Sequence, residues 1–146
     1  MKNAIEKASE IIKGRSAASA TFGTNDDHYC VLAQEDVDGL LTASVITAAK
    51  SDGIKTINFC TGIAGNKTKR IQRDNRAAVC FESGSYSITL KGRLEILTDA
   101  ETKHENWYSG IEDHFSGPDD PNYCVLRFTT EKYSLFVDWE EVVGVI

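Results

Sequence analysis

The sequence predicts a mainly β fold, a closed or nearly closed antiparallel barrel with a few short helices. Two observations predict it. Short stretches rich in β-branched and aromatic residues recur along the chain, and the Asp38-Gly39 and Asp52-Gly53 pairs join the first three of them into hairpins. The chain has 146 residues, the usual size of one domain, so we expect 1–146 to form a single domain.

The expected strands follow from alternation of apolar and polar residues between turn signals. They cover 29–34, 40–48, 54–61, 76–82, 86–98, 123–129 and 133–139. Gly92 lies inside the longest of them and predicts a bulge or a sharp bend. The sequence therefore describes a meander of strands with tight connections.

The expected helices are fewer and shorter. Residues 1–28 form a helical N-terminal extension, with an amphipathic helix over 2–13, while 17–22 fits either a short strand or a frayed helix end. A short helix is expected within 62–75, beginning near Asn66. Another starts at Asp99, whose side chain suits a helix start, and runs to about Ser109, and the last covers 111–115.

Composition excludes several classes of function. The net charge of -6 argues against a general nucleic-acid binder, which needs a basic surface. No apolar run approaches the roughly 20 residues that span a bilayer, and the N-terminus does not resemble a signal peptide. We therefore expect a cytoplasmic protein that binds neither nucleic acid nor membrane.

The cysteines and histidines do not indicate a metal site. The four cysteines form no C-x-x-C pair and lie in apolar, strand-like stretches, so we expect reduced core residues. The three histidines have no metal-ligand spacing with one another or with a cysteine, and no metal is expected. No catalytic acid, base or nucleophile is identified from the sequence.

One segment concentrates positive charge. Residues 62–76 contain five basic side chains and one acidic one, a local charge of +4, which leaves -10 for the rest of a chain whose total is -6. The basic residues are Lys67, Lys69, Arg70, Arg73 and Arg76. A basic island in an acidic protein predicts a local anionic ligand; a solvated helix face is the alternative.

The position of this island favours a phosphate. A strand ends at Thr61, a glycine-bearing loop follows, and a helix begins near Asn66 with Lys67 in its first turn. Free N–H groups at a helix start favour an anion, and Lys67 adds a full charge there. Thr61, Asn66 and Thr68 are expected to add neutral hydrogen bonds. The segment lacks the glycine spacing of better-defined phosphate loops.

The stretch 56–82, TINFCTGIAGNKTKRIQRDNRAAVCFE, resembles the pyridoxamine 5′-phosphate oxidase-like FMN-binding split-barrel family. The family pattern is a strand ending in Thr, then S-x-K, then a short basic helix ending in a D-P-like turn. Thr61, Lys67 and Asp74-Asn75 match these places. Gly65 stands where the family often has Ser, which removes one phosphate hydroxyl.

The resemblance continues on both sides. Asp38-Gly39 followed by LLTASVI resembles the family's flavin-facing strand, with Ser44 where members often carry a phosphate-binding Arg. YSITLKGRLEIL places Ser87 where related proteins have a side chain near the flavin ring. The C-terminal third, from ENWYSGIEDHF to VDW, resembles the bacterial general stress protein 26-like branch.

This resemblance implies a split β-barrel that binds FMN between the two subunits of a homodimer. The phosphate would lie at the basic helix and the preceding strand end, and the ring along the second strand, held by main chain and near Ser87. The implied cofactor-binding residues are Ser44, Val45, Ile46, Thr47, Cys60, Thr61, Gly65, Asn66, Lys67, Thr68 and Ser87.

The implied activity is an FMN-dependent oxidoreductase with a nicotinamide donor and an unknown, small-molecule acceptor, in a stress-related role. Two alternatives stay open. One is a non-catalytic protein that binds FMN, a deazaflavin or haem. The other is a split barrel that has lost its ligand, to which Gly65 and Ser44 give weight.

Overall fold

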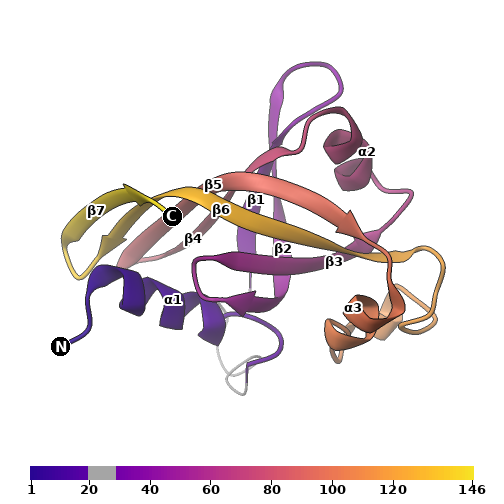
Figure 1. Ribbon diagram of the computed structural model, residues 1–146, viewed down its shortest axis with the longest axis horizontal. Coiled ribbons are helices and arrows are strands. Elements are labelled where there is room, and N and C mark those ends of the chain that lie inside the picture. Colours follow the sequence, from indigo (N-terminus) through magenta and orange to yellow (C-terminus); the bar gives the residue numbers. More distant parts are fainter. Residues whose placement is uncertain (20–28) are drawn as a thin grey trace.

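The computed structural model describes residues 1–19 and 29–146 (Figure 1). Part of the expected N-terminal extension, and of the ambiguous stretch 17–22, lies outside these residues. The helices are α1 (Ala4–Gly14), α2 (Asn66–Arg73), α3 (Ala100–Glu105) and a 3-10 turn (Ile111–Asp113). The strands are β1 (Tyr29–Glu35), β2 (Leu41–Asp52), β3 (Thr56–Gly62), β4 (Arg76–Ser83), β5 (Tyr86–Leu97), β6 (Tyr123–Val137) and β7 (Glu140–Val145).

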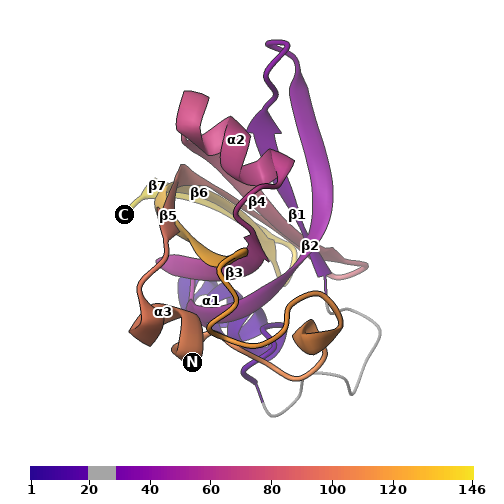
Figure 2. The ribbon, with the colours of Figure 1, turned by 90° about the vertical axis from the view of Figure 1, so that its right-hand side faces the viewer.

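The strands form one antiparallel sheet that closes on itself. Their order is β3-β2-β1-β4-β5-β6-β7, and β3 also pairs with β6. Six strands therefore make a closed barrel, and β7 extends the sheet beyond it (Figure 2). The mainly β, antiparallel split-barrel fold that the sequence predicts is confirmed.

Strand β6 differs from the expectation. The sequence predicted two strands, over 123–129 and 133–139, but β6 is continuous from Tyr123 to Val137, and the next strand is the unexpected β7. The residues between the two expected strands do not turn, because Thr130 is buried and tied to the β2–β3 connection. Its hydroxyl donates to the Ile54 carbonyl at 2.5 Å, and its N–H donates to the Lys55 carbonyl at 2.9 Å.

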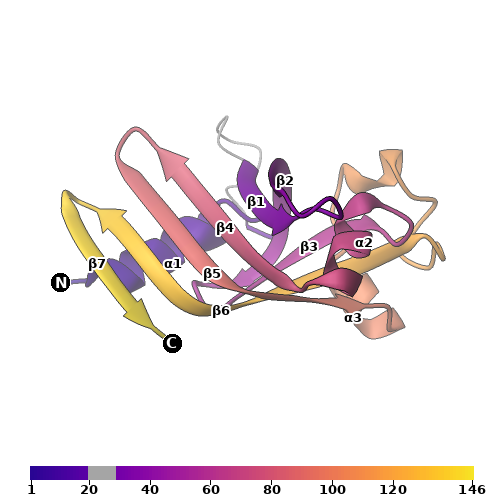
Figure 3. The same cartoon turned by 90° about the horizontal axis from the view of Figure 1, so that it is seen from above.

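The barrel interior is filled by aromatic and branched aliphatic side chains. Phe59, Phe81 and Phe128 are among the largest that are fully buried. Helix α1 lies along one side of the strands (Figures 1 and 3) and buries Ala8 and Ile12 against them. None of the four cysteines is bridged: Cys30 and Cys124 are buried, and Cys60 and Cys80 are half-buried.

The helices follow their sequence signals with shorter bounds. Asp99 caps α3 as expected, and its carboxylate accepts from the Thr102 N–H at 3.0 Å. The helix ends at Glu105 rather than near Ser109, because Trp107 leaves it to pack edge-on against the buried Tyr123 in a second small core. None of the described helices is long and apolar enough to cross a membrane.

The bulge expected at Gly92 is confirmed. The register between β5 and β6 shifts between Lys91 and Gly92, so that one residue of β6 is extra. The backbones approach closely there: a Cβ atom at Gly92 would lie 1.9 Å from the Thr129 carbonyl oxygen. Only glycine therefore fits at this point of the barrel.

Replacing Gly92 by alanine tests this constraint. We expect Gly92→Ala to lower the free energy of unfolding by about 3 kcal/mol, because the added methyl group forces the two strands apart. Gly84→Ala is the matched control, since a Cβ atom there meets nothing within 4 Å. Urea denaturation of the two variants would contradict this view if they lost equal stability.

Candidate functional site

The candidate site begins at the loop between β3 and α2. The N–H groups of Ile63 and Ala64 donate to Asn122, to its carbonyl at 2.7 Å and its side-chain oxygen at 3.4 Å. Helix α2 then starts at Asn66, as expected, with Gly65 as an N-cap that has no side chain to offer. The N–H groups of residues 66–68 have no acceptor among the described residues. This helix start is therefore uncapped, a favourable place for an anion.

Lys67 lies in the first turn of α2 and is half-buried. No carboxylate in the described part of the chain forms an ion pair with it. Burial lowers the pKa of its amine, and the neighbouring charge of Arg70 lowers it further. A partly buried cation without a counter-ion is unfavourable by itself, so an anion bound beside it would be stabilised.

The arginines of α2 are paired within the chain. Arg70 Nε lies 3.2 Å from Asp36 Oδ1, and this contact holds the pKa of Asp36 below its usual range. Arg73 donates to the Asp36 carbonyl at 2.8 Å and lies 3.7 Å from the Glu35 carboxylate. Both arginines therefore attach α2 to the β1–β2 hairpin.

Arg76, at the start of β4, is paired as well. It lies 2.6 Å from the Asp74 carboxylate and lowers the pKa of Asp74 to about 2. The anion site therefore includes fewer residues than the basic island. The three arginines of the island have carboxylate partners, whereas the ammonium group of Lys67, at the uncapped helix start, has none among the described residues. Lys69 is also unpaired within the described residues, but it is exposed.

Two predicted site residues point elsewhere. The Thr68 hydroxyl is fully buried and lies 2.7 Å from both the Ile63 and Gly65 carbonyls, so it stabilises the loop from within. The Cys60 thiol lies 3.3 Å from the Asn106 carbonyl, in the second core, and burial raises its pKa to about 11. Thr61, half-buried on β3 opposite Cys124, stays close to the loop.

The predicted ring site lies on a strand edge that the barrel leaves open. Residues 41–47 of β2 pair with β1 on one side. On the other side, β2 pairs with β3 only from Ala48 to Asp52, and 41–47 have no strand partner in the described part of the chain. Ser44, Val45, Ile46 and Thr47 lie in this stretch. Within the described residues, the main-chain groups on this edge are therefore available to bind a ligand.

Ser87 lies apart from this edge. It is exposed on β5, and strands β4 and β1 separate β5 from β2. Three strand spacings put it about 14 Å from the ring site of its own chain. One chain alone therefore does not bring Ser87 together with Ser44–Thr47.

Three residues that support the site from behind were not predicted from the sequence. Gln34, buried on β1, donates to the Lys67 carbonyl at 3.2 Å and so fixes the first turn of α2. Asn122 and Asp36 hold the loop and the helix from distant parts of the chain. Only their polar character next to apolar stretches could have drawn attention to them.

Solved structures share this fold. General stress protein 26 from Bacillus anthracis superposes with a TM-score of 0.77 at 17% identity, covering 97% of each chain. A pyridoxamine 5′-phosphate oxidase-related, FMN-binding protein from Nostoc punctiforme has a TM-score of 0.56 at 17% identity, covering 81% of this chain and 86% of that one.

A haem-binding protein from Mycobacterium smegmatis is also similar, with a TM-score of 0.69 at 15% identity, covering 99% of this chain and 59% of that one. The same architecture therefore accompanies different ligands. No curated protein matches the chain.

The family model described as pyridoxamine 5′-phosphate oxidase-like matches residues 7–141. The match includes the barrel, α2 and the free edge of β2. The resemblance seen in the sequence is confirmed, and the chain belongs to the pyridoxamine 5′-phosphate oxidase-like family.

Proposed function

We propose that this protein binds FMN, with the phosphate at the start of α2 and the ring along the free edge of β2. The half-buried, unpaired Lys67 beside an uncapped helix start is the observation that carries the proposal. A phosphate would supply the missing counter-ion and the missing acceptors together. Family membership and the FMN-binding relative from Nostoc support this choice of ligand.

The residues at the start of α2 fit a phosphate that is bound mainly by one lysine and by main-chain N–H groups. Gly65 has no hydroxyl, and the side chain of Ser44 has no charge, so Lys67 and the N–H groups of residues 66–68 would provide most of the binding. Gln34 and Asn122 would keep this first turn in place. Bound FMN would supply the redox chemistry, and the chain would supply its position and hydrogen bonds.

We further propose that the protein is a cytoplasmic oxidoreductase in which FMN passes electrons from a nicotinamide donor to a small molecule. The open edge of β2 supports it, because main-chain groups there would hold the ring while leaving one face accessible. The alternative is a protein that binds FMN without turnover, and reduction of the bound flavin by NADH or NADPH distinguishes the two.

The proposal includes a homodimer. Four apolar side chains of the β1–β2 hairpin and β2 are largely exposed in one chain: Val37, Leu40, Leu41 and Val45. A second copy would cover them and would bring its own Ser87 toward the ring, which Ser87 of the same chain does not reach. Light scattering that finds only monomer with FMN bound contradicts this part of the proposal.

Titration with FMN tests the phosphate site. We expect Lys67→Ala to weaken FMN binding by about 10- to 100-fold, because it removes a charged hydrogen bond to the phosphate. Lys69→Ala is the matched control, with the same charge change on the same helix, and should bind almost as the unmodified protein does. Quenching of flavin fluorescence reports the affinity.

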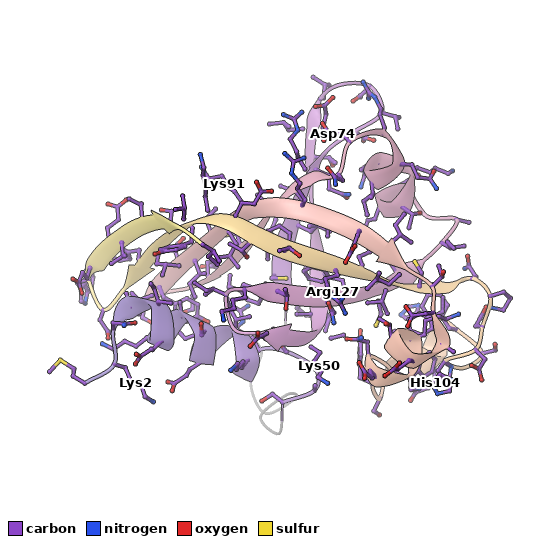
Figure 4. All side chains as sticks on the ribbon, viewed as in Figure 1. Lys2, Lys50, Asp74, Lys91, His104 and Arg127 are labelled. Atoms are coloured by element: carbon purple, nitrogen blue, oxygen red, sulfur yellow. The ribbon has the colours of Figure 1, made fainter. Side chains whose placement is uncertain are left out.

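Two outcomes of this titration would count against the site. If both lysine variants lost the same affinity for FMN, binding would depend on the overall positive charge of the helix and not on the position of Lys67. An unmodified protein that ignores FMN but takes up haem would favour the alternative suggested by the mycobacterial relative. Of the described histidines, His104 is bonded to Asp119 on the α3 side of the molecule (Figure 4).

Anaerobic mixing tests the enzymatic claim. We expect NADH or NADPH to bleach the absorbance of the bound flavin, because an oxidoreductase must accept electrons from its donor. The control is free FMN under the same conditions. A bound flavin that is reduced no faster than free FMN would make the protein a binding protein rather than an enzyme.

A further inference from the structure

A separate hollow lies on the outer surface of the barrel, over β1, β4, β5 and β6. Its volume is about 560 Å³, within the usual range for small-molecule sites. Its lining includes Ala33, Ala77, Ala78 and Gly92, and also Lys91 and Lys132. Figure 4 labels Lys91 and Asp74, two lining residues that project from the same side of the barrel. Lys67 and residues 44–47 do not line it.

The floor and the two lysines belong to one row across the sheet. Ala33 pairs with Ala78, Ala78 with Lys91, and Lys91 with Lys132. Residues directly opposite each other in an antiparallel sheet project from the same face. The two alanines therefore continue into a pair of lysines, with about 5 Å between neighbouring strands.

The bulge in β6 creates this lysine pair. On the barrel side of the bulge, Gly92 pairs with Thr130, and continuing that register would place Glu131 opposite Lys91. The extra residue shifts the register, and Lys132 stands there instead. An attractive Lys–Glu pair is thus replaced by two like charges, which destabilise a sheet when they lie opposite each other. Bulges commonly re-aim side chains beside functional sites.

The other charges around the hollow do not compensate the lysines. The three carboxylates of the lining are paired with arginines: Glu131 with Arg93 at 3.0 Å, Asp74 with Arg76 at 2.6 Å, and Glu35 with Arg76 at 3.5 Å. Neither Lys91 nor Lys132 forms an ion pair with any described residue, and both are exposed. In a chain of net charge -6, the fold therefore places two uncompensated cations together at one end of an apolar floor.

We propose that this hollow binds a flat aromatic anion, with its ring on the alanine floor and its negative group between Lys91 and Lys132. The small side chains let a planar ring approach the sheet closely. Carboxylate, sulfonate and phosphate groups share the chemistry that the lysine pair recognises.

Titration of the full-length protein with anilinonaphthalene sulfonate tests the site, because this anion carries a planar naphthalene ring and fluoresces when it leaves water. We expect the double variant Lys91→Ala/Lys132→Ala to bind about tenfold more weakly, since two screened charge contacts are lost. Lys91→Arg/Lys132→Arg should retain binding. Removing a repulsive pair leaves the fold intact, which thermal melting of each variant checks.

Two single variants separate this site from other surfaces and from the flavin site. Lys50→Ala, an exposed lysine on β2, should leave binding of the dye unchanged. Lys67→Ala should weaken binding of FMN but not of the dye. The double variant should weaken binding of the dye but not of FMN. Equal dye affinity in the double variant and the unmodified protein overturns the proposal. So does a parallel loss of FMN in the double variant, which would make the hollow part of the flavin site.

Discussion

The site depends on how strand β6 divides its hydrogen bonds. Its first half pairs with β3 and closes the barrel, and its second half pairs with β7 on the same edge. Because β3 turns toward β6, it leaves β2 after the pair of Ala48 with Phe59. In residues 1–19 and 29–146, nothing pairs with the remaining edge of β2. Closing the barrel and opening the ligand edge are thus two results of one pairing (Figure 2).

The same closure positions the helix that carries the anion site. Asn122, immediately before β6, holds the loop that follows β3. Arg70 and Arg73 then attach α2 to the β1–β2 hairpin, which projects beyond the barrel. Two of the five basic residues of the island therefore hold the helix in place. Lys67 and the uncapped amides are left to act on a ligand.

The sequence predicted what local signals control. The Asp-Gly turns, the start of α2 at Asn66 and the bulge at Gly92 each follow from the conformational demands of one or two residues. The continuity of β6 could not be predicted in this way, because it depends on Thr130 bonding to Ile54, distant in the chain. From the sequence alone, the polar residues 130–132 therefore resembled a turn between two strands.

The candidate site divides in the same manner. Lys67 and the helix start are visible in the sequence, since both lie within a few residues of each other. The pairing of Arg70 with Asp36, the support from Gln34 and the inward turn of Thr68 require the tertiary fold. The lysine pair at 91 and 132 is hidden for a further reason: the regular register would have placed Glu131 beside Lys91.

The central claim is that the start of α2 receives the phosphate of FMN. Amide chemical shifts of the labelled protein, followed by NMR during titration with FMN, test it most directly. If the phosphate binds there, the largest shifts occur at the amides of Asn66, Lys67 and Thr68, with smaller ones along 44–47. Saturable binding that leaves the amides of 66–68 unmoved, and shifts those of another surface, would contradict it.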